Sequence, residues 1–150
     1  MTSDDLQPGP GVVLASTGPM VYRTEIDAAG HALIADEPVA LGGTDAGPSP
    51  YDLLASALAS CTSMTLQLYA RRKGLELTEV NVRVEHAKIH ATDCEDCETK
   101  VGRIDQFKRR ISLEGEIDAA ARQRLLEIAD LCPVHRTLSS EVQILTELAE

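Results

Sequence analysis

Residues 49–74 read SPYDLLASALASCTSMTLQLYARRKG, and they carry the clearest structural signal in this chain of 150 residues. Ser49 is a favourable N-cap, Pro50 suits the first helical position, and Asp52 completes a variant of the capping box. Apolar residues then recur at spacings of three and four: Leu54, Ala57, Leu58, Cys61, Met64 and Leu68. The pattern predicts a mostly buried helix that ends near Gly74.

The segment before this helix is predicted to be rich in strands. Alternating or β-branched apolar residues at 12–16, 20–26 and 31–35 predict three short strands, the last two joined by a hairpin turn. Residues 41–50 contain three glycines and two prolines, which interrupt any regular period and predict a loop that leads into the helix. Residues 1–11 show no period, so we expect a flexible N-terminus.

After the helix, three further strands are predicted at residues 80–89, 111–117 and 142–148. The charged residues 100–110 are expected to form a loop between the first two of these strands. Asp118 caps a second helix that Pro133 ends, because proline disfavours the α conformation in the residue before it. The order β-β-β-α-β-β-α-β predicts an α+β fold with a mostly antiparallel sheet, and residues 12–150 are expected to form a single domain.

The composition restricts the classes of partner. A net charge of −10 and a pI near 4.8 argue against sequence-independent binding to nucleic acid or to anionic membranes, which both require a positive field. We recognise neither a signal peptide nor a membrane-spanning run of apolar residues. We therefore expect a cytoplasmic protein without nucleic-acid or membrane partners.

The four cysteines are the residues whose chemistry has to be decided. In a reducing compartment they are reactive thiols, metal ligands or buried packing residues rather than a disulfide framework. Cys61 lies on the apolar face of the first helix, where a packing role is the alternative to reactivity. Cys132 precedes Pro133 and the start of a short helical turn, so backbone N–H groups favour its thiolate, with His135 and Arg136 close by. A helix-end cysteine without function is the alternative for Cys132.

A second cysteine segment, His86-x3-His90-x3-Cys94-x2-Cys97, offers imidazole and thiolate ligands at spacings that zinc accepts. The C-x-x-C part is also a dithiol that can cycle with a disulfide. A solvated loop with incidental thiols is the third interpretation. Apart from this possible zinc, we expect no cofactor.

Three stretches, in order, resemble the OsmC/Ohr superfamily of organic hydroperoxide reductases: GPSPYDLL at 47–54, ASCTSM at 59–64 and ADLCPVH at 129–135. The resemblance implies an intertwined homodimer whose antiparallel sheets surround the cysteine-bearing helices, with active sites at the subunit interface. It also implies that Cys61 attacks the peroxide, that Cys132 resolves the resulting sulfenic acid as a disulfide, and that a dithiol reductant restores the pair.

The sequence departs from the family pattern around the first cysteine. Well-studied members supply an arginine and a glutamate there; the position of the glutamate is Tyr51 here, with Asp52 beside it. The arginine has no clear match, and Arg23 and Arg136 are the candidates to replace it. Our leading hypothesis is a thiol-dependent, peroxiredoxin-like peroxidase of organic hydroperoxides. The alternative is a non-catalytic relative that binds a small ligand between subunits or a metal ion.

Overall fold

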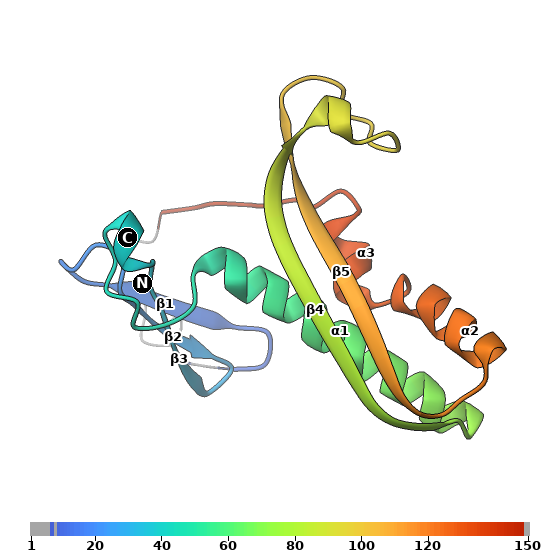
Figure 1. The fold of residues 1–150 in the computed structure, drawn as a ribbon. Helices are drawn as coiled ribbons and strands as arrows, with labels where there is room; N and C mark the ends of the chain where they lie inside the picture. Colours follow the sequence, from blue (N-terminus) through green and yellow to red (C-terminus); the bar gives the residue numbers. More distant parts are fainter. Residues whose placement is uncertain (1–6, 8, 149–150) are drawn as a thin grey trace. The chain divides into compact units, whose positions relative to one another are not determined.

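The computed structural model describes residue 7 and residues 9–148, so the expected flexible segment 1–11 lies largely outside the described residues. The strands are β1 (Val13–Thr17), β2 (Thr24–Ala28), β3 (His31–Ala35), β4 (Glu76–His90) and β5 (Arg103–Glu116). The helices are α1 (Pro50–Lys73), α2 (Ala119–Ala129) and α3 (Pro133–Leu138), with 3-10 turns η1 (Val39–Leu41) and η2 (Ala91–Asp93) (Figure 1). Both sheets are antiparallel, which confirms the predicted α+β class.

The chain divides into two compact units, which we describe separately. The first contains the residues up to Leu53 together with those from Ile144, and the second is Leu54–Gln143. The division reflects contacts within one chain, and the single-domain expectation stays a prediction.

In the first unit, β1, β2 and β3 form a three-stranded sheet in that order, as the alternation of apolar residues predicts. The loop after β3 is fixed by Asp36, which is only 1% exposed. Its carboxylate accepts hydrogen bonds from the N–H groups of Glu37, Thr44 and Ala46 and from the Thr44 hydroxyl, at 2.5–3.2 Å. A Cβ on Gly47 would lie 2.0 Å from the Ile34 carbonyl oxygen, so the loop requires glycine there.

The predicted cap of α1 is present. The Ser49 hydroxyl and N–H both donate to Asp52 Oδ2, at 2.8 and 2.9 Å, and the Asp52 N–H donates back to Ser49 Oγ at 3.2 Å. These hydrogen bonds from Ser49 lower the pKa of Asp52. Asp52 therefore holds the start of the helix, whatever further role it has.

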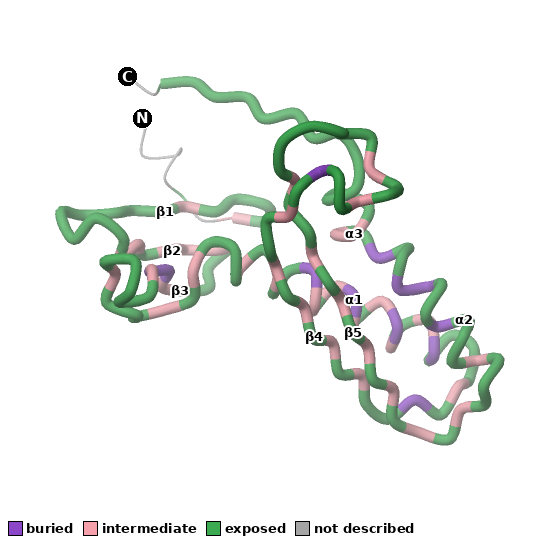
Figure 2. Tube along the Cα trace, turned by 45° about the horizontal axis from the view of Figure 1, so that its top comes forward, coloured by how far each residue is buried: buried purple, intermediate pink, exposed green. Residues whose placement is uncertain are grey.

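In the second unit, α1 and α2 pack with the β4–β5 hairpin, and Figure 2 shows the buried residues gathered on these two helices. The buried cluster consists of Leu66, Ala70, Leu77, Leu125, Ile128 and Ala129. Asp118 caps α2 as predicted, because its Oδ1 accepts the Ala121 N–H at 2.7 Å. This core fixes the middle of α1 against the C-terminal end of α2.

Two predicted elements are wrong. Most of the charged segment 100–110 is not a loop but part of β5, in which Ile104, Phe107 and Arg109 are half-buried while most residues between them are exposed. Residues 142–148 form no strand in this structure, and their apolar side chains are exposed. A strand needs a partner, and within the described chain this segment pairs with none.

By length and composition alone, α1 would also qualify as a membrane-spanning helix. Core helices of soluble proteins pass the same test. Leu58, Thr62, Leu66 and Ala70 bury one face of α1, whereas other apolar residues of the helix, such as Met64 and Leu68, are exposed.

Candidate functional site

Two free thiols meet where α1 passes the turn between α2 and α3. Cys61 lies in the middle of α1 and is half-buried, whereas Cys132 is the N-cap of α3 and has no exposed surface. The two side chains are close enough for each to change the pKa of the other. The structure therefore brings together the two cysteines that the sequence singled out, although they are 71 residues apart.

An open cavity of about 350 Å³ lies beside Cys61. Its walls are mostly apolar and come from α1 and from the start of α3: Ala57, Ser60, Cys61, Met64, Thr65, Leu68, Pro133 and Val134. Cys132 does not line it. A small apolar molecule can therefore approach the Cys61 sulfur, while Cys132 lies behind it.

The surroundings of the two thiols act on their pKa values in opposite directions. Burial raises the pKa of Cys61, and the neighbouring Cys132 adds to this effect, although the Val134 N–H and the Thr65 hydroxyl oppose it. Burial also disfavours the Cys132 thiolate, but hydrogen bonds from the His135 N–H, Cys61, Thr62 and the Val134 N–H outweigh it and lower the pKa of Cys132. When the pair Cys61/Cys132 has lost one of its two protons, the negative charge therefore rests mainly on Cys132.

Arg109 of β5 is the cation at this site. Its side chain is 11% exposed. The guanidinium donates to Thr62 Oγ1 at 2.9 Å, to the Ala129 carbonyl at 3.2 Å and to Asp130 Oδ1 at 2.8 Å, and it lies 3.3 Å from His135 Nδ1. Arg109 thus ties β5 to α1 and to the segment that carries Cys132.

Thr62 connects Arg109 to the thiols. Its hydroxyl also bonds to the Leu58 carbonyl at 2.7 Å and lies within hydrogen-bonding reach of Cys132. Neither Arg109 nor Thr62 was predicted to belong to the site, since residues 100–110 were expected to form a charged loop. The signal that would have found it is the alternation along residues 103–116, which places Arg109 on the same side of the strand as Phe107 and Ile111.

Two of the other candidates for the cation and the acid belong to the first unit, and the third is an exposed residue of the second unit. Arg23 precedes β2 in the first unit and lies 3.8 Å from Glu25. Asp52 belongs to the same unit and caps α1. Arg136 is an exposed residue of α3. A role for these three at the thiol site stays a prediction.

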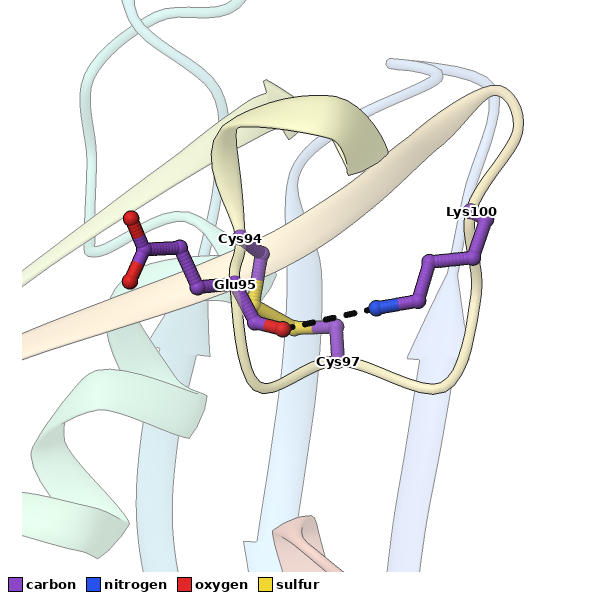
Figure 3. Close-up of a disulfide and its surroundings, with 4 residues drawn as sticks. All are labelled: Cys94, Glu95, Cys97 and Lys100. Atoms are coloured by element: carbon purple, nitrogen blue, oxygen red, sulfur yellow. Dashed lines mark hydrogen bonds between the residues drawn. A yellow bond between two sulfur atoms is a disulfide. The ribbon is translucent and has the colours of Figure 1, made fainter.

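The four expected zinc ligands are not gathered at one point. Cys94 and Cys97 are joined in a disulfide (Figure 3). His86 Nε2 lies 2.8 Å from Asp105 Oδ1, and four residues of strand separate His86 from His90 by roughly 13 Å. Within residue 7 and residues 9–148, no group of three or more His, Cys, Asp or Glu side chains is arranged to hold a metal ion. Sequence spacing suited zinc, but the extended backbone separates the histidines.

Comparisons with solved structures agree with this architecture. An OsmC-like protein from Mycoplasma pneumoniae is 19% identical, with 85% of each chain covered and a TM-score of 0.67. The organic hydroperoxide resistance protein OsmC from Legionella pneumophila is 19% identical, with 85% of this chain and 88% of that chain covered and a TM-score of 0.62. The protein OhrB of Bacillus subtilis is 20% identical, with 85% and 89% covered and a TM-score of 0.59. At these identities the likeness concerns the fold.

No curated protein matches the sequence. The family model described as OsmC-like protein matches residues 43–147, which include α1, the β4–β5 hairpin and both free cysteines. The chain therefore belongs to the OsmC-like protein family.

Proposed function

We propose that the protein is a thiol-dependent peroxidase that reduces organic hydroperoxides and acts in oxidative-stress defence. The observation that carries the proposal is the arrangement of the two thiols: Cys61 lines an apolar cavity, and Cys132 is buried close enough to Cys61 to change its pKa. A reactive thiol with a second thiol beside it suits a reaction in which the first is oxidised and the second forms a disulfide with it. The relatives from Legionella pneumophila and Bacillus subtilis are described as organic hydroperoxide resistance proteins.

In the proposed reaction, the Cys61 sulfur attacks the terminal oxygen of the hydroperoxide. The O–O bond breaks, the leaving alkoxide takes a proton from solvent and departs as the alcohol, and Cys61 becomes a sulfenic acid. The Cys132 sulfur then attacks the Cys61 sulfur and releases water, which leaves a Cys61–Cys132 disulfide. A dithiol reductant donates two electrons and two protons and restores both thiols.

The surroundings of Cys132 supply a proton acceptor for the first step. Because hydrogen bonds from the His135 N–H and Thr62 favour the Cys132 thiolate despite its burial, that thiolate can take the proton of Cys61 as Cys61 attacks. Arg109 is a positioning residue in this scheme, since it holds the Thr62 hydroxyl. Roles for Arg23 and Arg136 stay predictions beside this one.

We also propose a cytoplasmic homodimer. Met64 and Leu68, which border the cavity on α1, are 70% and 48% exposed in the single chain. An apolar helix face of this kind suits burial against a second copy.

The test is consumption of cumene hydroperoxide and of hydrogen peroxide in the presence of a dithiol, with wild type, Cys61→Ser and Cys132→Ser in one assay. We expect faster consumption of the organic peroxide and no turnover with Cys61→Ser. In the absence of monothiols, each Cys132→Ser chain should reduce one peroxide molecule and then stop, because no second thiol resolves the Cys61 sulfenic acid. The matched control is Cys94→Ser/Cys97→Ser, which should keep wild-type activity. If folded wild-type protein consumes the peroxides no faster than the dithiol alone, the proposal is refuted.

One observation favours the alternative, a non-catalytic protein that binds a small apolar ligand. Burial raises the pKa of Cys61, and a protonated thiol is a weak nucleophile. If this alternative holds, an apolar ligand without a peroxide group should protect Cys61 from alkylation, while peroxide consumption stays at background.

A further inference from the structure

The Cys94–Cys97 disulfide lies in the connection between β4 and β5, at the tip of the hairpin (Figures 1 and 3). The Cα atoms of the two cysteines are 5.5 Å apart, a normal separation for a disulfide. Both cysteines are half-buried, and the residues between them, Glu95 and Asp96, are exposed. A small thiol in solution can therefore approach this disulfide.

The disulfide is not needed to close the hairpin. Strands β4 and β5 are paired from Glu76↔Glu116 to His90↔Arg103, and the Ala91 N–H donates to the Gly102 carbonyl at 2.8 Å beyond the last pair. A disulfide between residues only three apart removes little conformational freedom from an unfolded chain. Neither cysteine belongs to the buried cluster of this unit. A purely structural role would thus contribute little.

The surroundings are those of an exchange site. Lys100 reaches across the loop, where its Nζ lies 3.4 Å from the Glu95 carbonyl oxygen between the two cysteines (Figure 3). A cation in this loop favours the thiolate that leaves when the S–S bond is attacked, while the exposed carboxylates of Asp93, Glu95, Asp96 and Glu98 oppose it. Exposed disulfides are in general the reducible ones.

The hairpin tip is separate from the Cys61/Cys132 pair. Arg109, which contacts Thr62 beside that pair, is opposite Val84 in the β4–β5 register. Six residues of strand, roughly 20 Å, lead from Val84 to His90 before the tip begins. Cys94 and Cys97 therefore lie apart from the two free thiols of the same chain.

We propose that Cys94 and Cys97 form a second, reversible thiol–disulfide exchange site that accepts two electrons from a dithiol. One reductant thiolate attacks a sulfur of the disulfide, the S–S bond breaks, and the other cysteine leaves as a thiolate that takes a proton. The second reductant thiol then attacks the mixed disulfide, which frees the remaining cysteine and leaves the reductant as a disulfide. This site does not depend on peroxide chemistry at Cys61.

The experiment equilibrates the native, full-length protein in buffers of reduced and oxidised dithiothreitol at a series of ratios. Acid quenching, alkylation, trypsin digestion and mass spectrometry then read the state of each cysteine. Trypsin cleavage after Lys88 and Lys100 puts both loop cysteines in one peptide, residues 89–100, apart from Cys61 and Cys132. We expect its reduced-to-oxidised ratio to change roughly tenfold for each tenfold change in the buffer ratio, from either direction.

The variant Cys61→Ser/Cys132→Ser distinguishes this proposal from the peroxidase proposal. It abolishes peroxide turnover by design, and we expect the loop peptide to titrate at the wild-type ratio. A loop that stays oxidised in excess dithiothreitol until the protein is denatured would show a structural disulfide and refute the proposal. Loop thiols that remain reduced in the most oxidising buffer would also refute it. If the redox state of the loop peptide no longer follows the buffer ratio in Cys61→Ser/Cys132→Ser, the two sites are not independent.

Discussion

Arg109 donates a hydrogen bond to the hydroxyl of Thr62 at 2.9 Å, and this contact joins the middle of β5 to the middle of α1. The same guanidinium bonds to the Ala129 carbonyl and to Asp130, directly before the turn that carries Cys132. The planar guanidinium group of arginine has five N–H donors and can donate to acceptors in several directions at once. A lysine ammonium group on its flexible side chain cannot make the same set of hydrogen bonds. The contact therefore depends on arginine and not on positive charge alone.

We expect Arg109→Lys to slow peroxide consumption roughly tenfold, which corresponds to about 1.4 kcal/mol, because Thr62 loses its fixed position beside Cys132. The effect should fall on kcat rather than on KM, since Arg109 does not line the cavity. Steady-state kinetics with cumene hydroperoxide measure both constants. Arg110→Lys is the matched control, because Arg110 is the exposed neighbour on the same strand. Equal losses in the two variants would contradict a positioning role for Arg109.

The local signals in the sequence were sufficient for most elements. The Ser49–Asp52 cap, the period of α1 and the break at Pro133 follow from interactions between residues close in sequence, and each is present in the structure. The pairing of Cys61 with Cys132 came from the family resemblance. The position of Arg109 at the site depends on the register of β5 against β4 and on the packing of α1, which no local pattern encodes.

The wrong predictions have a related cause. The loop predicted at residues 100–110 is wrong because Phe107, Arg109 and Ile111 alternate with exposed residues along a long strand. The zinc hypothesis stays a prediction, but its spacing argument did not include the extended strand geometry that separates His86 from His90. The strand expected at 142–148 has suitable residues but no pairing partner in the chain as described. The number of residues between two side chains gives their distance in space only when the backbone conformation between them is known.

The shared proton of the two thiols leads to a second prediction. Hydrogen bonds lower the pKa of Cys132 despite its burial, whereas burial and Cys132 raise the pKa of Cys61. As pH rises, we expect the ultraviolet absorbance of thiolate to show one early ionisation per chain. Cys61→Ser should keep this step because the serine hydroxyl can still donate to Cys132, and Cys132→Ser should lose it. These titrations use the Cys94→Ser/Cys97→Ser background. An early step that survives Cys132→Ser would assign the thiolate to Cys61.

Asp36 gives a prediction about stability and pH. The Thr44 hydroxyl is the main cause that lowers its pKa to about 2, burial opposes this, and the N–H groups of Glu37, Ala46 and Thr44 add to it. A depressed carboxyl pKa stabilises the folded state fully above the usual value of 3.8, and the contribution is lost as pH falls from there toward 2. We expect Asp36→Asn to lower Tm by roughly 5 °C or more at neutral pH, with a smaller difference from wild type near pH 3.

Thermal unfolding followed by circular dichroism at several pH values tests this prediction. Asp45→Asn is the control, because Asp45 is an exposed carboxylate in the same loop. It should leave Tm almost unchanged over the whole range. A constant difference between wild type and Asp36→Asn from neutral pH to pH 3 would show that ionisation of Asp36 is not the source of the stability.

The charge of the hairpin tip predicts which thiols reduce the Cys94–Cys97 disulfide fastest. Asp93, Glu95, Asp96 and Glu98 are exposed, and Lys100 is the one cation in residues 93–100. Cationic cysteamine should therefore reduce this disulfide several-fold faster than anionic 2-mercaptoethanesulfonate, after normalisation to their rates with a neutral small-molecule disulfide. The difference should shrink in about 0.5 M salt, where charges are screened within a few ångströms, and in Glu95→Gln/Asp96→Asn. Equal normalised rates at low salt would mean that these carboxylates do not select the reductant.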